Sequence, residues 1–209
     1  MSQVSDETEA PSAGDDAHIS SVGGYTVTVT PAKFTMVDFD PAVIAETAAG
    51  LCGPIGLPAG LELRIEVDQT TPLGRAFIAG TDPAVLAVES GALEDNHRPR
   101  QFHEGNAVMV LGRLLIKLRD RRDPAFGEVP TDEDLSLELS AAWDAYAIGR
   151  LGRLGHPVNR QRRIYQFRVR HGFTDDVDAA FARLWDGEDL TWERIQQISI
   201  EASPVAPTS

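Results

Sequence analysis

Cysteine is nearly absent from this sequence, because Cys52 is the only one in 209 residues. One thiol excludes an internal disulfide, so the fold depends on an apolar core, and 42% hydrophobic residues are enough to build one. Cys52 lies in the apolar stretch LCGPIG, where burial raises the pKa of a thiol and suppresses its reactivity. We therefore expect a buried, inert residue.

Long hydrophobic runs are also missing. Gly, Arg or Glu interrupts each apolar stretch well before the roughly 20 residues that a membrane-spanning helix needs. The opening MSQVSDETEAPSAGDDAH is acidic and polar, unlike a signal peptide. These features predict a cytoplasmic protein without a membrane partner.

Basic residues are scarce at both ends of the chain. Residues 1–97 hold 3 Lys and Arg against 15 Asp and Glu, residues 98–170 hold 14 against 9, and residues 171–209 hold 2 against 8. This basic centre indicates either a surface for an anion such as nucleic acid or a set of cations that pair with the acidic segments. The net charge of −13 favours internal pairing, because it repels polyanions from the whole molecule.

A zinc-protease motif is incomplete in the stretch QFHEGNAVMVLGRLLI. His103 and Glu104 begin an apolar helical run, but position 107, where the second zinc-binding histidine would stand, is Ala. The helix, strand, strand, strand, helix order predicted for residues 41–121 resembles the layout of small zincin metalloproteases. That resemblance implies a related fold without the metal, and His103 and Glu104 are then an ordinary helix entry.

The remaining candidates for chemistry are isolated. His97, His156 and His171 lie far apart in the sequence, next to Arg, Gly or Pro, and do not have the spacing of a metal site. The glycine pairs in GPIG and GRLGRLG lack the phosphate-loop spacing and its lysine. We expect no metal, no cofactor and no catalytic residue.

Alternating apolar and polar residues predict four strands in the first half, in GYTVTVTP, LELRIEVDQ, GRAFIAG and AVLAVESG. No regular strand-helix repeat separates them, so we predict an α+β fold with a small mixed or antiparallel sheet. The expected single domain covers residues 23–202, with the sheet in 23–126 and a helical part in 127–202. Residues 1–22 and 203–209 are poor in large apolar side chains and are expected to be disordered tails.

Apolar residues spaced by three and four predict the helices. We expect one after Asp40 that GPIGLPAG ends, one over about 104–121, and one that starts at Thr131 and its acidic followers and runs to about Gly155. NRQRRIYQFRVRHGF fits either a strand or a helix ended by Gly172, and we favour the helix. Two further helices follow Thr174 and Asp189 or Thr191.

Small residues recur in the helix expected after Thr131, at Ala142, Ala145, Gly149 and Gly152. Glycine costs about 1 kcal/mol relative to alanine inside a helix, so its presence twice indicates close approach of another backbone. We expect that approach at Gly112 of the helix over 104–121.

The candidate binding set is an arginine run with an aromatic residue, namely Arg160, Arg162, Arg163, Tyr165, Arg168 and Arg170. Guanidinium groups beside aromatic rings suit an anion or a single-stranded nucleic acid through charge and stacking. The alternative is a helix that buries its aromatic face and leaves the arginines in water.

These features favour a non-catalytic interaction or scaffold protein with a protein partner. The second interpretation is anion or single-stranded nucleic-acid binding through residues 160–170. The third is an enzyme whose site forms only when distant residues converge in the folded chain.

Overall fold

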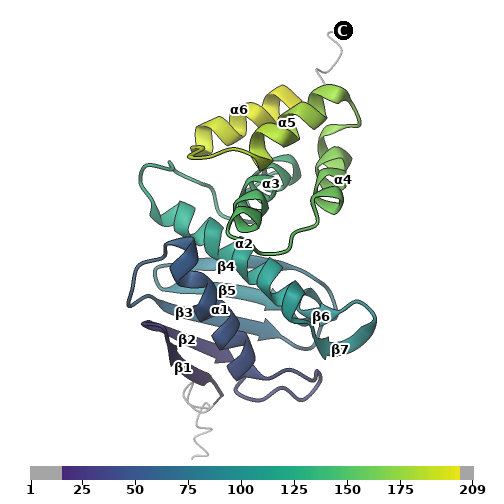
Figure 1. The fold of residues 1–209 in the computed structure, drawn as a ribbon. Helices are drawn as coiled ribbons and strands as arrows, with labels where there is room; N and C mark the ends of the chain where they lie inside the picture. Colours follow the sequence, from purple (N-terminus) through teal and green to yellow (C-terminus); the bar gives the residue numbers. More distant parts are fainter. Residues whose placement is uncertain (1–15, 203–209) are drawn as a thin grey trace, which may run out of the picture.

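The structure, a computed structural model, describes residues 16–202 (Figure 1). These residues form a sheet-containing half followed by a helical half, so the predicted α+β class is confirmed. The strands are β1 (His18–Val22), β2 (Tyr25–Thr30), β3 (Glu62–Asp68), β4 (Ala76–Thr81), β5 (Ala84–Glu89), β6 (Glu94–Asp95) and β7 (Arg98–Phe102). The helices are α1 (Pro41–Ile55), α2 (Glu104–Arg122), α3 (Leu137–Arg153), α4 (Arg160–His171), α5 (Asp175–Trp185) and α6 (Trp192–Ala202).

The main sheet is mixed, with the strand order β1-β2-β3-β5-β4. β2 pairs with β3 and β3 with β5 in parallel, while the outer hairpins β1-β2 and β4-β5 are antiparallel. The alternation in β3 is clean, because Leu63, Ile65 and Val67 are buried and the residues between them are exposed.

Residues 18–22 do not belong to a disordered tail, and that part of the prediction is wrong. They form β1, whose backbone pairs with β2 from His18 opposite Val29 to Val22 opposite Tyr25. Gly23 and Gly24 both have positive φ, which suits a two-residue hairpin turn. Backbone pairing orders this short strand despite its few apolar side chains. The rest of that tail, residues 1–15, and the tail 203–209 lie outside the described residues.

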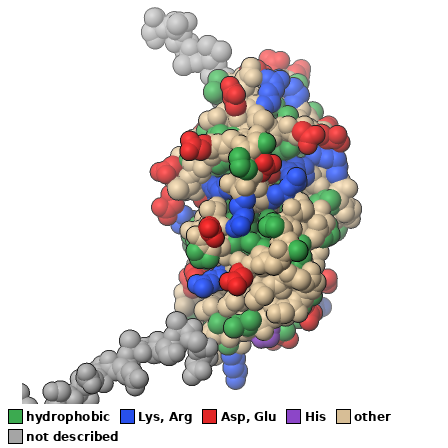
Figure 2. Space-filling view, turned by 90° about the vertical axis from the view of Figure 1, so that its left-hand side faces the viewer, with side chains coloured by type: hydrophobic (Ala, Val, Ile, Leu, Met, Phe, Trp, Pro, Cys, Tyr) green, Lys and Arg blue, Asp and Glu red, His purple; other side chains and the backbone are tan. Residues whose placement is uncertain are grey.

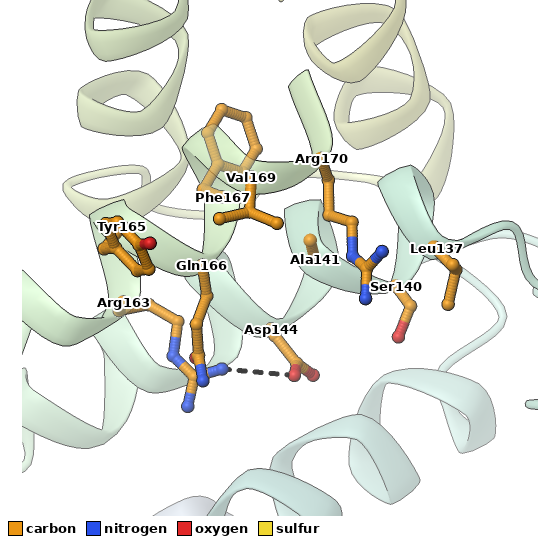
Figure 3. A pocket seen from close by; sticks show the side chains of 10 residues that line it. All are labelled: Leu137, Ser140, Ala141, Asp144, Arg163, Tyr165, Gln166, Phe167, Val169 and Arg170. Atoms are coloured by element: carbon orange, nitrogen blue, oxygen red, sulfur yellow. Dashed lines mark hydrogen bonds and ion pairs between the residues drawn. The ribbon is translucent and has the colours of Figure 1, made fainter. Parts of the chain in front are cut away.

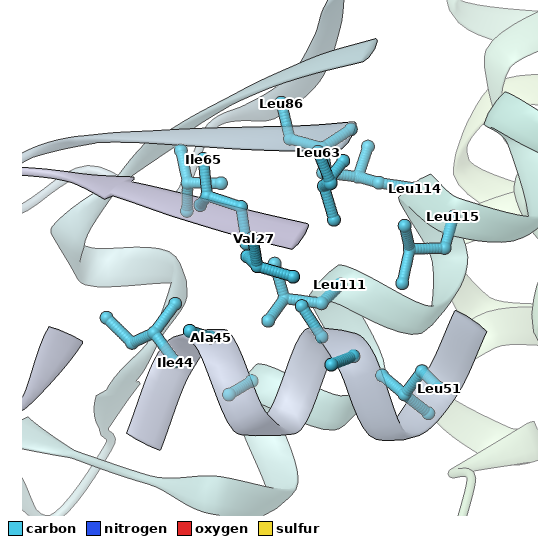
Figure 4. Close-up of a cluster of buried hydrophobic side chains, with 14 of the residues drawn as sticks. Val27, Ile44, Ala45, Leu51, Leu63, Ile65, Leu86, Leu111, Leu114 and Leu115 are labelled. Atoms are coloured by element: carbon cyan, nitrogen blue, oxygen red, sulfur yellow. The ribbon is translucent and has the colours of Figure 1, made fainter. Parts of the chain in front are cut away.

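Helices α1 and α2 cover one face of the sheet (Figures 1 and 4). In Figure 4, side chains of both helices meet those of the strands in one apolar cluster. Asp40 caps α1 through its carboxylate, which accepts a hydrogen bond from Ala42 N at 2.8 Å. The helix ends within GPIGLPAG, as predicted, with Ile55 as its last residue and Gly56 as its C-cap at a φ of 85°.

Helices α3 to α6 enclose a second apolar core. α3 belongs to both cores, because Trp143 and Tyr146 point into the helical one while Ala147 and Leu151 pack against the sheet half. The favoured helix over 160–171 is confirmed as α4, with Gly172 at its C-cap.

α3 begins six residues later than predicted from Thr131, at Leu137 after the cap Ser136. Thr131 instead donates its hydroxyl to Asp134 in a turn. Asp132 accepts hydrogen bonds from the Ile78 amide of β4 and from Arg121. These tertiary bonds hold the segment outside the helix and also cover the edge of β4. No helix among residues 16–202 is long and apolar enough to cross a membrane.

Candidate functional site

His103 is the cap of α2. Its Nδ1 accepts a hydrogen bond from the Asn106 amide at 3.0 Å. Position 107, where a zinc ligand would be needed, is an alanine buried in the core between α2 and the sheet. The resemblance to zincins is therefore not confirmed. Within residues 16–202, no group of His, Cys, Asp or Glu side chains has the arrangement of a metal site.

Cys52 is buried, as predicted, and its thiol donates to the Ala48 carbonyl at 3.2 Å. Burial raises the pKa of this thiol to about 12. The group is therefore protonated at neutral pH and a poor nucleophile.

His171 lies inside the helical core rather than in a loop. Its ring stacks on Phe167 with 3.9 Å between ring centroids, and its Nε2 lies 2.9 Å from the Ser199 hydroxyl of α6. Desolvation lowers the pKa of His171, although its contact with the Phe167 carbonyl opposes the shift. The neutral imidazole thus serves as a polar link between α4 and α6.

Because the predicted arginine run forms the helix α4, its side chains point in different directions and contact different partners. The Arg160 guanidinium lies 5.3 Å from the centre of the Phe181 ring, and Arg168 forms a bidentate ion pair with Asp178. Arg163 contacts Asp144 of α3 at 3.3 Å. Arg162, Tyr165 and Arg170 are exposed. Arg163, Tyr165 and Arg170 line one hollow, and Arg162 and Arg163 line another.

Asp144 is the centre of a charge cluster that joins three helices. It lies 2.5 Å from Lys117 Nζ and 3.0 Å from Arg113 Nη1, both on α2, and it also contacts Arg163 of α4. Burial alone raises the pKa of this carboxyl, but the three cations outweigh burial and hold its pKa well below the usual range. Asp144 is therefore a permanent anion.

Lys117 is the cation of this cluster that is most shielded from solvent. Its side chain is 3% exposed and its ammonium lies 4.7 Å from the centre of the Trp143 ring. Desolvation lowers the pKa of Lys117, and the carboxylate of Asp144 opposes that shift. Arg113, Lys117 and Arg121 lie at intervals of four residues along one side of α2. Asp144 of α3 pairs with the first two, and the Trp143 ring of α3 lies against Lys117 and Arg121.

A second buried ion pair lies at the same contact between α2 and α3. Asp120 of α2 accepts hydrogen bonds from Arg150 at 2.6 Å and from the Trp143 indole at 3.0 Å. Burial raises the pKa of Asp120 against the opposing effect of Arg150. Neither acid was predicted from the sequence as a functional residue, although an isolated Asp at position 144, within an apolar helix stripe, is a recognisable signal for a buried ion pair.

Two hollows lie beside the charge cluster around Asp144, and both are lined by Asp144, Arg163 and Gln166. The first, of about 400 Å³, lies between α3 and α4 (Figure 3). Exposed apolar side chains gather on it. Leu137, Tyr165 and Val169 line it with exposed fractions of 59%, 60% and 51%, and the exposed ring of Phe173 packs edge-on against Tyr165.

The second hollow is a polar cleft of about 510 Å³ between the two halves of the molecule. α2 contributes Arg113, α4 contributes Arg162 and Arg163, and Asp144 is the only acid among its lining residues. Several amides and His103 complete the wall, namely Asn96, Asn106, Asn159 and Gln166 beside that imidazole.

Lys and Arg side chains also form a band across the middle of the face in Figure 2, between acidic side chains. A third, smaller hollow between the two halves is lined by Arg119, Arg150 and Arg153 together with Glu188 and Asp189. Basic residues of the central segment therefore gather where the sheet half meets the helical half.

Comparison with known protein families, curated proteins and solved structures gives no match. The α3-α4 hollow and the polar cleft therefore provide the structural basis for the proposals below.

Proposed function

We propose that this protein is a non-catalytic binding protein that docks an acidic, apolar segment of a protein partner on the face formed by α3 and α4. The observation that carries the proposal is the clustering of Leu137, Tyr165, Val169 and Phe173, four large apolar side chains that are each more than half exposed. Contiguous apolar side chains at a surface are a common mark of a protein-binding site.

The geometry of α4 favours a defined binding face. Tyr165 and Val169 are one turn apart on this helix, and Gly172 lets the chain turn so that Phe173 comes to lie against Tyr165. Gly172 has φ 107° and ψ 173°, a backbone conformation that is accessible essentially to glycine alone. Aromatic side chains of this kind provide large contact areas at low entropic cost.

Charge complementarity selects the partner. Arg170 lines the same hollow and is exposed. It has no ion-pair partner among residues 16–202. An acidic residue in a docked segment can therefore pair with it, which steers association and fixes orientation. We also propose a cytoplasmic location, because a sequence with a single cysteine cannot form the internal disulfides that are typical of small secreted domains.

The test is selection of peptides from a random displayed library on the full chain. We expect enrichment of peptides that combine Leu, Phe or Trp with Asp or Glu. The variant Tyr165→Ser with Phe173→Ser should lose this binding, by about tenfold or more in affinity, because two aromatic anchors are removed.

The matched control is Ile200→Ser on α6, since Ile200 is 71% exposed and lies outside the α3-α4 hollow. This variant should bind the selected peptides as the unchanged chain does. The proposal fails if no acidic, apolar peptides are enriched, or if the double variant retains their binding.

A further inference from the structure

We propose that the polar cleft between the sheet half and the helical half binds a small phosphorylated, hydroxyl-bearing molecule, with Arg113, Arg162 and Arg163 holding its phosphate. This cleft adjoins the apolar docking hollow and shares Asp144, Arg163 and Gln166 with it. The apolar side chains that line the docking hollow do not line the cleft, whereas Arg113, Arg162 and His103 line only the cleft. The inference about this cleft does not depend on the proposed docking function.

The charges around the cleft are unbalanced. Arg113, Lys117 and Arg163 all contact Asp144, so one carboxylate is shared among three cations. Arg162 lines the same cleft and has no acidic partner among residues 16–202. These five groups leave a formal excess of three positive charges in a place where two of the arginine side chains are largely buried.

The arginines also repel one another. Burial lowers the pKa of Arg163; Asp144 opposes this shift, while the positive charges of Arg113 and Arg162 add to it. A bound anion relieves this repulsion. A phosphate monoester carries about −1.5 to −2 charges at neutral pH and presents three acceptor oxygens, so it offsets most of the excess and matches the fork geometry of guanidinium groups.

The rest of the wall determines the size and polarity of the ligand. A volume of about 510 Å³ exceeds what a lone phosphate ion occupies and falls in the range of small-molecule sites. Asn96 and Gln166 offer both donors and acceptors to hydroxyl groups. His103 uses Nδ1 as the acceptor of its cap, so in the neutral imidazole Nε2 carries the hydrogen and is a further donor.

Binding to the full chain can be measured by calorimetry and by thermal shift at low ionic strength. The probes are ribose 5-phosphate, inorganic phosphate and ribose. We expect ribose 5-phosphate to bind and raise the melting temperature, inorganic phosphate to bind more weakly, and ribose not to bind. Arg162→Gln should weaken the binding of ribose 5-phosphate about tenfold or more, because it removes a charge-assisted contact.

Arg162 suits this test because it is exposed and has no ion pair within the described residues, so we expect its replacement to leave the fold intact. Arg170→Gln is the matched control, since Arg170 is exposed on the same helix but does not line the cleft. The Arg170→Gln variant should bind ribose 5-phosphate as tightly as the unchanged chain does.

Three results would overturn the proposal. One is the absence of binding by either phosphate compound. Another is equal weakening by Arg162→Gln and Arg170→Gln, which indicates diffuse surface charge. The third is tighter binding of a single-stranded oligonucleotide than of ribose 5-phosphate, with both variants weakening it equally, which indicates an extended nucleic-acid surface instead.

Discussion

Gly149 is the residue at which backbone approach matters most in α3. A Cβ atom added there would lie 2.9 Å from the carbonyl carbon and 3.1 Å from the Cα of Trp185, and it would collide with the Trp185 carbonyl oxygen. Backbone cannot rotate away as a side chain can. The expected close approach therefore exists, but its partner is the end of α5 rather than Gly112, and that part of the prediction is wrong.

Gly152 differs from Gly149 although both were assigned the same role. A Cβ atom at Gly152 would meet the Cγ2 of Val158 at 2.8 Å, and a valine side chain on a loop can shift more easily than backbone. Gly112 faces Leu151 in the same way, with 2.8 Å to its Cδ1. Gly112 and Gly152 thus make room for side chains, whereas Gly149 makes room for backbone.

We predict that Gly149→Ala destabilises the protein by about 1–3 kcal/mol through overpacking, despite the better helix propensity of alanine. Gly152→Ala should have a much smaller effect, because a gain of about 1 kcal/mol in propensity offsets the displacement of Val158. Urea denaturation of the two variants measures both changes. Equal effects of the two substitutions would show that the contact with Trp185 does not constrain Gly149.

Among the elements, those with strong periodicity were predicted correctly from sequence. β3 alternates through seven residues and α2 repeats its apolar positions over nineteen, so local pattern alone defines them. β1 was missed because its order comes from pairing with β2 across a turn. The hairpin β6-β7 was missed because its mostly polar and charged residues have no apolar alternation.

The candidate site was less predictable than the fold. The arginines at positions 162 and 163 were identified, but periodicity could not reveal that Arg163 shares Asp144 with Arg113 and Lys117 from α2. These residues lie up to 50 positions apart in the sequence. Their convergence depends on how α3 and α4 pack against α2, which no local pattern specifies.

Asp144 stabilises the packing of three helices, so its charge is expected to matter. We predict that Asp144→Asn lowers the free energy of unfolding by about 3–5 kcal/mol, because it leaves buried cations of α2 and α4 without their carboxylate. The measurement is urea denaturation at neutral pH, where the depressed pKa of Asp144 keeps the native group ionised.

Asp178→Asn is the control for this substitution. It also removes a carboxylate from an arginine pair, but the pair with Arg168 is open to solvent and should contribute little. Similar destabilisation by both variants would contradict the structural role assigned to the buried cluster.

At the scale of the whole molecule, part of the basic central segment is paired with acids of its own. Asp120, Asp132 and Asp144 pair with arginines or lysine of the same segment. Of the ion pairs within residues 16–202, only that of Arg168 with Asp178 joins this segment to a flanking acidic one. Internal pairing was predicted, but the expected partners were the acidic arms. Within residues 16–202, the other acidic side chains of the two arms form no ion pair with the central segment.

The two halves share elements rather than a simple linker. α3 contributes Ala147 and Leu151 to the sheet core, while Trp143 of the same helix lies in the helical core. Two cations of α2, Arg113 and Lys117, form ion pairs with Asp144 of α3. Unfolding of the helical half removes α3 from the sheet core and exposes apolar surface there. The two halves should therefore unfold as one cooperative unit.

The chain carries a natural reporter in each half with which to test this cooperativity. Its three tryptophans, Trp143, Trp185 and Trp192, all lie in the helical core, and its single cysteine, Cys52, lies in the sheet core. Burial and the pKa of about 12 protect the Cys52 thiol from reagents in the native state, so labelling reports opening of the sheet half. We predict that tryptophan fluorescence and pulse labelling of Cys52 give the same urea midpoint. Labelling that begins well before or after the fluorescence transition would show that the halves fold independently, and that the α2-α3 seam is a contact between two domains.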